Sequence, residues 1–285
     1  NYLATPCSQA EVLSEHGRRS GFFMSTVEKK PYIHLSIDDT FEIFKDLAQN
    51  AMYYSSIFEN PYLHFLEMLH TQYGLVASMY CFTEEGDFSL SNVPDIFCPD
   101  FTKSADWLKW GFHGRSQNSR YQYASGRKAQ KDYSFAIREL LRCIDVAPRL
   151  HFFAGTWECI RAMCQSDHGL KGLFSADDDR LSYYLDSTQS KLLKAYGLYY
   201  DQAMNLFFFS TDIRLERIQS IAKERTNMEY CLLGNERKSN GLHVFTHENR
   251  LANEEICQKI IDLCVFAQER SIPFAFPLQR LDLVL

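Results

Sequence analysis

The sequence lacks the features that mark several large classes of protein. Its nine cysteines contain no Cys-x-x-Cys pair, and their odd number and scattered positions form neither a zinc-ribbon pattern nor a small disulfide framework. No apolar run approaches the roughly 18 residues that a membrane helix needs. Basic residues cluster only in isolated pairs, and the net charge is −6, which disfavours a phosphate-tracking surface. We therefore expect no membrane span and no nucleic-acid partner.

Several catalytic signatures are absent as well. No G-x-G-x-x-G follows the first predicted strand, and neither G-x-x-x-x-G-K-[ST] nor the G-x-S-x-G elbow occurs. Cys159 and Cys164 lie near His151, but their helical spacing predicts core residues rather than a nucleophile. Scattered cysteines favour reduced thiols and a cytoplasmic protein, whereas Asn1 in place of Met leaves a removed signal peptide open.

The composition predicts one large globular domain. Hydrophobic residues make up 46% of the 285 residues, enough to bury a core, and a single α/β barrel uses about 200 to 250 residues. We expect residues 1–30 to form an irregular segment that packs on or flanks the barrel, and residues 31–285 to form the barrel domain.

A strand followed by a helix recurs along the chain. Residues 32–37 are rich in β-formers and end at Asp38, Asp39 and Thr40, where Thr40 is expected to cap the next helix. Further strands are predicted at residues 75–82, 107–112, 150–153, 170–174, 206–210, 242–245 and 272–276. Helices are predicted at residues 61–73 and 157–164. Two more helices are predicted, one that places Tyr133, Ile137, Leu140 and Ile144 on one face and one that begins at Asn253. Seven or eight such units indicate a parallel sheet, either open and doubly wound or closed. Without a nucleotide-binding motif, an α/β barrel is favoured, with its chemistry at the C-terminal ends of the strands.

Asp38 and Asp39 are the most specific feature of the sequence. Adjacent carboxylates repel each other, so one commonly takes a cation while the other accepts a proton. The simpler alternative is that an aspartate here only caps the following helix. The position at the end of the first strand favours the functional interpretation.

Residues 36–41 resemble the first motif of the polysaccharide deacetylase family, Thr-Phe-Asp-Asp-Gly, with Thr40 in place of the glycine. The resemblance implies a distorted (β/α)7-8 barrel of the glycoside hydrolase and deacetylase type. It also implies that Asp38 is the catalytic base, that Asp39 binds a divalent metal such as zinc, and that the substrate is a carbohydrate or glycan.

Two later segments resemble further motifs of that family. The second motif is a histidine with another histidine four positions on; His113 fits the first as a metal ligand, but Gln117 stands at the second. Imidazole is much the better metal ligand. Residues 242–248 resemble the last motif through His247, which implies a general acid, and Glu248 is either a supporting carboxylate or a helix-start acid. For His113 a purely structural role stays open, and His243 is expected to pack within its strand.

The remaining motifs are represented more loosely. Residues 153–157, with Trp157, occupy the place of the family's Arg-x-Pro-Tyr/Trp-Gly segment, and Arg149 could stand in for its arginine. Trp157 could equally be a core residue. Asp178 and Arg180 follow the next strand, where they either orient the catalytic groups and the substrate or belong to a solvated loop.

These residues support three functions, which we rank. The first is a metal-dependent hydrolase that removes N- or O-acetyl groups from a carbohydrate. The second is a catalytically inactive carbohydrate-binding or scaffolding protein of the same fold, suggested by Gln117. The third is a metal-independent glycosidase that uses two of Asp38, Asp178 and Glu248, which would require their carboxyl groups to lie roughly 5 to 9 Å apart.

Overall fold

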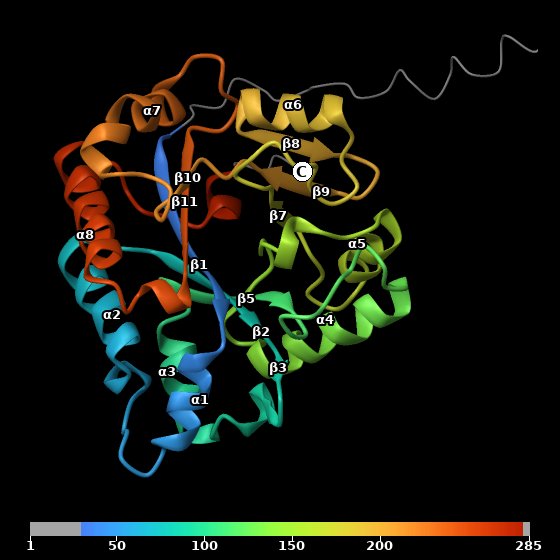
Figure 1. Cartoon of the computed structure of the whole chain (residues 1–285), viewed down its shortest axis with the longest axis vertical. Helices are drawn as coiled ribbons and strands as arrows, with labels where there is room; N and C mark the ends of the chain where they lie inside the picture. Colours follow the sequence, from blue (N-terminus) through green and yellow to red (C-terminus); the bar gives the residue numbers. More distant parts are fainter. Residues whose placement is uncertain (1–29, 282–285) are drawn as a thin grey trace, which may run out of the picture.

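Parallel β-strands occupy the centre of the molecule, and α-helices cover them on the outside (Figure 1). The computed structural model describes residues 30–281, so the predicted irregular segment 1–30 lies almost entirely outside the described residues. A six-stranded sheet has the order β10-β11-β1-β2-β5-β6, with every pair parallel. None of the helices in the described part of the chain combines the length and apolar character needed to cross a membrane.

The strands are β1 (Tyr32–Thr40), β2 (Ala77–Phe82), β3 (Glu84–Glu85), β4 (Phe88–Ser89), β5 (Leu108–Gly114), β6 (Ile144–Asp145), β7 (Gly172–Phe174), β8 (Leu198–Asp201), β9 (Leu206–Phe209), β10 (Ile213–Arg214) and β11 (Gly241–His247). The helices are α1 (Glu42–Gln49), α2 (Pro61–Tyr73), α3 (Cys98–Lys103), α4 (Gly126–Leu140), α5 (Trp157–Cys164), α6 (Ser187–Tyr196), α7 (Ile221–Leu233) and α8 (Glu254–Glu269). Two short 3-10 helices also matter for the site, η4 (His151–Phe153) and η5 (Glu248–Arg250).

Hydrogen bonds continue the strand arrangement beyond β6. The N–H groups of Lys171 and Gly172 donate to the carbonyl of Val146 at 2.9 and 3.2 Å, and that of Phe174 donates to Pro148 at 3.1 Å. Strand β7 then pairs in parallel with β9, and residues 210–212 lead from β9 into β10, which pairs with β11. The strands thus follow one another around a shared interior, in agreement with the expected α/β architecture, and the very short β6 and β10 distort the ring.

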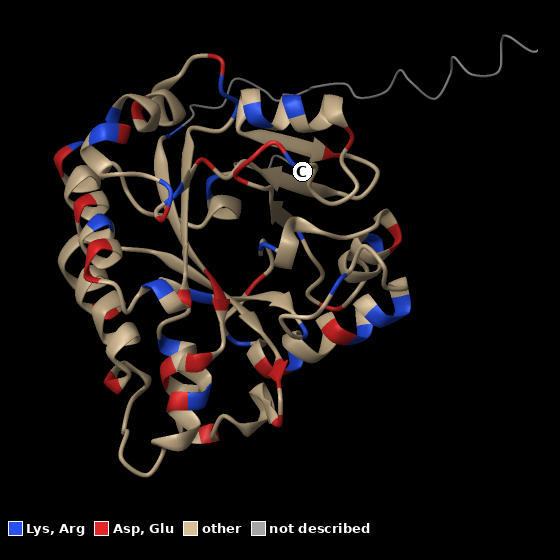
Figure 2. Ribbon diagram, viewed as in Figure 1, with Lys and Arg blue, Asp and Glu red and all other residues tan. Residues whose placement is uncertain are grey.

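Two buried apolar clusters join the strands to the helices. The larger lies between β1, β2 and β11 and helices α1, α2 and α8, where Leu35 and Leu263 are fully buried. The smaller lies between β5, β7 and β9 and helices α4 and α5. Burying each such leucine stabilises the fold by roughly 1.5 to 3 kcal/mol. Charged residues lie mainly on the outer helices and turns, while the central strands are almost entirely uncharged (Figure 2).

The interior enclosed by the strands holds polar side chains packed among aromatic rings such as that of Phe174. His34, Ser36 and Asp38 alternate along β1, so all three face this interior, and all are buried. His34 Nε2 lies 3.0 Å from Ser78 Oγ, and the Ser78 hydroxyl donates to Asp145. Burial lowers the pKa of His34 and raises that of Asp145, because both charged forms lose hydration. This column of polar side chains leads to the C-terminal ends of the strands.

Several predictions of local structure are confirmed, and others are wrong. Helices α2 and α5 have the predicted bounds, and Asn253 caps α8 by accepting from the N–H of Glu255 at 2.8 Å. The eight cysteines in the described residues are free thiols.

Residues 151–153 form a short 3-10 helix rather than a strand, and Ile144 belongs to β6 rather than to the preceding helix. Residues 272–276 contribute only an isolated bridge between Phe274 and Ile33. Thr40 does not cap α1: its hydroxyl donates to the carbonyl of Ile37 instead. These errors fall where tertiary contacts override local preference.

Candidate functional site

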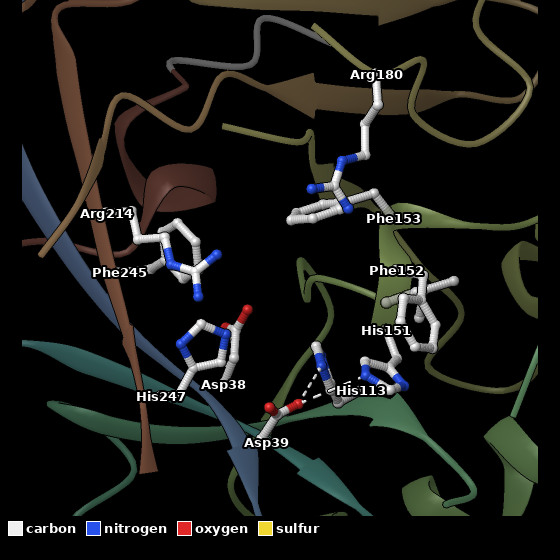
Figure 3. A pocket seen from close by; sticks show the side chains of 11 residues that line it. Asp38, Asp39, His113, His151, Phe152, Phe153, Arg180, Arg214, Phe245 and His247 are labelled. Atoms are coloured by element: carbon white, nitrogen blue, oxygen red, sulfur yellow. Dashed lines mark ion pairs between the residues drawn. The ribbon is translucent and has the colours of Figure 1, made fainter. Parts of the chain in front are cut away.

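Both carboxylates of the Asp38-Asp39 pair enter one pocket at the end of β1 (Figure 3). In a regular strand, adjacent side chains point to opposite faces of the sheet. Here the backbone of Asp39 has a φ of 58°, in the left-handed region, and the register between β1 and β2 shifts between Ile37 and Thr40. This break in the alternation lets Asp38 point toward His247 while Asp39 points toward His113 and His151. Such backbone strain is characteristic of functional sites.

Asp39, His113 and His151 bring three potential metal-ligand atoms together. Asp39 Oδ1 lies 3.1 Å from His113 Nε2 and 3.9 Å from His151 Nε2, and one ligand atom from each residue lies within 4.8 Å of the others. Ligands at about 2.0 to 2.1 Å from a tetrahedral ion are separated from one another by roughly 3.4 Å. The three residues could therefore hold a metal ion with little movement.

The hydrogen bonding of His113 also fits a cation. Its Nδ1 lies 2.5 Å from the carbonyl oxygen of Arg149, which can only accept, so this nitrogen carries the ring hydrogen. In the neutral imidazole, Nε2 then presents a lone pair to the carboxylate of Asp39. Two acceptors at 3.1 Å repel each other unless the ring is protonated or a cation lies between them. Orientation of a ligating histidine through its other ring nitrogen is usual at metal sites.

The pKa values of the other two residues agree with a ligand role. Burial would raise the pKa of Asp39, but its close contact with the imidazole of His113 outweighs this effect and lowers the pKa to about 2. Burial, with the neighbouring His113, lowers the pKa of His151 to about 3. At neutral pH the site therefore offers a carboxylate and a neutral imidazole, the forms that bind metal. Two imidazoles and a carboxylate suit a divalent ion such as zinc.

The third ligand is not at the position that the sequence suggested. Gln117 is exposed and does not line the pocket; its backbone N–H bonds Glu85 at 3.3 Å. His151, in η4 after β6, lies beside His113 instead, with ring centroids 5.1 Å apart. The available signal for it was a histidine within the predicted strand 150–153, beside the apolar Leu150.

Arg149 holds Asp38 from the polar interior. Its Nη1 donates to Asp38 Oδ1 at 2.7 Å and to Ser36 Oγ at 3.0 Å, and its Nη2 donates to Thr211 Oγ1 at 3.1 Å. The side chains of both ion-pair partners are at most 3% exposed. Arg149 thus compensates the buried charge of Asp38 and fixes its orientation, because an unpaired buried carboxylate would cost several kcal/mol.

Glu216 orients His247, and sequence reasoning did not single it out. His247 Nδ1 lies 2.8 Å from Glu216 Oε1. Burial lowers the pKa of His247, but the hydrogen bond to Glu216 and the nearby carboxylates outweigh it, so the pKa is raised. Burial would likewise raise the pKa of Glu216, yet the bond to His247 lowers it to about 2. The pair favours a protonated imidazole beside Asp38. Glu216 lies two residues after the end of β10, a strand that was not predicted from the sequence.

The remaining predicted residues have different places. Glu248 is buried and accepts hydrogen bonds from the N–H groups of Phe41, Glu42 and Ile43 at 2.8 to 2.9 Å, so it caps α1. Trp157 is 45% exposed and does not line the pocket. Arg180 lines the pocket and is paired with Asp178 through two hydrogen bonds, one of them at 2.7 Å. His243 is buried in β11, as expected.

The pocket has a volume of about 160 Å³. Enclosing drug-sized ligands takes about 300 to 1,000 Å³, so this pocket encloses only a small reacting group of a larger ligand. Its lining comprises Asp38, Asp39, His113, Leu150, His151, Phe152, Phe153, Arg180, Arg214, Phe245 and His247.

Solved structures that resemble the chain are deacetylases and esterases. A structure described as T48 deacetylase with substrate is 9% identical, covering 88% of this chain and 90% of that chain, with a TM-score of 0.47. A family 4 acetyl xylan esterase from Clostridium thermocellum, in complex with a cobalt ion, is 9% identical, covering 87% and 89%, with a TM-score of 0.46. A peptidoglycan N-acetylglucosamine deacetylase is 12% identical, covering 86% of each chain, with a TM-score of 0.41. No protein-family model and no curated protein matches the chain.

Proposed function

We propose that this pocket hydrolyses an acyl group, N- or O-linked, on a carbohydrate. The observation that carries the proposal is the meeting of Asp39, His113 and His151 in one pocket with Asp38 and His247. The motif resemblance of residues 36–41 and 242–248 suggests the same chemistry and the carbohydrate substrate. A divalent ion held by the three ligands would supply Lewis-acid polarisation of the acyl carbonyl.

The protein groups then have separate tasks. Asp38, held by Arg149 at 2.7 Å, accepts a proton from the water that attacks the acyl carbon. His247, kept protonated by Glu216 at 2.8 Å, donates a proton to the leaving nitrogen or oxygen as its bond to the acyl carbon breaks. The products are a carboxylic acid and a free amine or hydroxyl on the sugar.

The observations that suggested an inactive binding protein or a glycosidase are weaker once the contacts of the site are known. The inactive binding protein was suggested by the missing second histidine, and His151 offers a nitrogen in its place. The glycosidase needed two of Asp38, Asp178 and Glu248 as acid and base. Glu248 is engaged by three backbone N–H groups of α1, and Asp178 by Arg180. These contacts favour the acyl hydrolase over the glycosidase.

Metal content and acyl release test the proposal together. We expect the zinc-loaded protein to hold about one ion per chain and to release acetate from an acetylated glycan panel such as chitooligosaccharides and acetylated xylan. His151→Ala should lose the ion and the activity, whereas Asp38→Asn should keep the ion and lose activity by roughly 100-fold or more. His64→Ala, on the exposed surface of α2, is the matched control and should change neither. Failure of the wild type to bind metal, or full metal content in His151→Ala, would contradict the site.

A further inference from the structure

Two arginines that the proposed chemistry does not use point into the same pocket. Arg180 follows β7 and Arg214 lies in β10, and Figure 3 shows the guanidinium group of Arg214 above Asp38 and His247 and that of Arg180 beside Phe153, on another side of the cavity. Neither group contacts the three candidate metal ligands in Figure 3.

Aromatic rings support both guanidinium groups. Arg180 Cζ lies 5.3 Å from the centroid of the Phe153 ring, and Arg214 Cζ lies 5.6 Å from that of Phe245. Both phenylalanines also line the pocket. A guanidinium at such a distance from an aromatic ring is held by cation–π attraction while its N–H groups stay available for a ligand. The two cations are therefore positioned before any substrate binds.

The carboxylates that pair with Arg180 and Arg214 leave some of the N–H donors of these arginines without a partner among the described residues. Arg180 bonds Asp178 through Nε and Nη2. Arg214 Nε lies 3.4 Å from Glu216 Oε2 and is buried without a hydrogen-bond partner among the described protein groups. Glu216 itself is engaged by His247. An arginine carries five N–H donors, and a buried donor without a partner costs about 1 to 3 kcal/mol.

The two aspartates of the pocket already have partners, so they oppose an added anion less than free carboxylates would. Asp38 is already compensated by Arg149, and Asp39 faces His113. The side chains of Arg180 and Arg214 are 44% and 26% exposed, so a ligand can reach both. Planar guanidinium groups bind carboxylate and phosphate oxygens through paired, charge-assisted hydrogen bonds.

We propose that Arg180 and Arg214 form a subsite for an oxyanion, a carboxylate or phosphate carried by the substrate near its acyl group. The proposal deepens the proposed function, on which its placement of the acyl group rests. The preferred substrate class is then an acidic acylated sugar, either a uronic acid or a sugar phosphate, and neutral glycans are the poorer substrates.

Binding of simple sugars that cannot be deacylated tests the subsite apart from catalysis. Glucose, glucuronate and glucose 6-phosphate are titrated into the metal-loaded protein by calorimetry. We expect at least one of the two anions to bind about tenfold or more tightly than glucose, and the tighter of the two identifies the carboxylate or the phosphate as the source. Affinities equal to that of glucose for both would overturn the proposal.

Substitutions separate this subsite from an anion on the metal. Arg214→Gln and Arg180→Gln should each weaken the preferred anion by about tenfold while metal content is unchanged. Arg250→Gln removes an equal charge from an exposed position outside the pocket lining and should change affinity less than about twofold. Unchanged anion affinity in both pocket variants would overturn the proposal. Acetate release from a neutral glycan, with no preference for anions, would support the acyl hydrolase and reject the arginine subsite. Anion binding that depends on the arginines, without any hydrolysis, would support the subsite and reject the acyl hydrolase.

Discussion

At the scale of single residues, the site consists of charged groups held in pairs. Asp38 is held by Arg149, His247 by Glu216, and Asp39 by its position opposite His113. Each partner comes from a different part of the chain, and each decides the protonation or orientation of the group that it contacts. The proposed acid and base therefore depend on residues that do not touch the substrate.

Glu216→Gln should shift the pH dependence of acyl hydrolysis. The raised pKa of His247 means that the protonated acid is present below this pKa and is lost as pH rises through it. Removing the carboxylate lowers that pKa, so the alkaline limb of the kcat profile should move about one unit toward lower pH. The measurement is kcat against pH for the wild type and the variant.

Metal content of Glu216→Gln serves as the control and should be unchanged, because Glu216 is not one of the three candidate ligands. An alkaline limb that stays at the wild-type position, with or without a uniform loss of activity, would contradict the assignment of His247, held by Glu216, as the acid.

At the scale of elements, the start of α1 is fixed by a carboxylate from the far end of the chain. Three N–H groups of the first turn, from Phe41, Glu42 and Ile43, donate to Glu248 in η5. The first N–H groups of a helix have no partners within the helix, and the helix dipole favours a negative charge there. Because α1 begins just after Asp39, this contact fixes the turn that carries Asp39, a candidate metal ligand, against the end of β11.

Glu248→Ala should destabilise the fold by about 2 kcal/mol or more, because the variant loses charge-assisted hydrogen bonds at a buried helix start. The free energy of unfolding in urea measures this. Glu42→Ala is the matched control: Glu42 lies in the same turn, but its side chain is exposed and its ion pair within residues 30–281 is with Lys45, so we expect a change within about 0.5 kcal/mol. Equal effects of the two substitutions would mean that Glu248 does not anchor α1.

At the scale of the whole molecule, the candidate metal site joins three distant segments. Asp39 comes from β1, His113 from β5 and His151 from η4, all at the same end of the strand ring. A ligand that binds only the folded chain stabilises it by mass action. Metal occupancy should therefore be visible in the stability of the entire domain.

Zinc at about 100 times its dissociation constant adds about 2.7 kcal/mol to the stability of the folded chain. For a domain of this size that raises the Tm by on the order of 5 °C. We expect this difference between zinc-loaded and chelator-treated protein in calorimetry. His151→Ala should show almost no difference, while His64→Ala should behave as the wild type. An identical Tm with and without zinc in the wild type would count against the metal site.

The sequence by itself determined the local features that depend on neighbouring residues, such as strand ends and helix bounds. A run of β-formers ended by two acids placed Asp38 and Asp39 at the end of β1, and caps and apolar spacing gave helices such as α2 and α5 their bounds. The recurring strand and helix also indicated parallel strands, and parallel strands gather His113 and His247 at the same end as the aspartates.

Only the tertiary structure decided which side chains meet there. Arg149 reaches Asp38 across 111 positions of the chain, and Glu216 reaches His247 across 31. His151 lies beside His113 and Asp39, in residues that form the 3-10 helix η4 and not the predicted strand. Spacing along a chain encodes contacts within one helix or strand. Contacts between the ends of different strands depend on the order in which the strands lie side by side and on loop conformations, which no local pattern specifies.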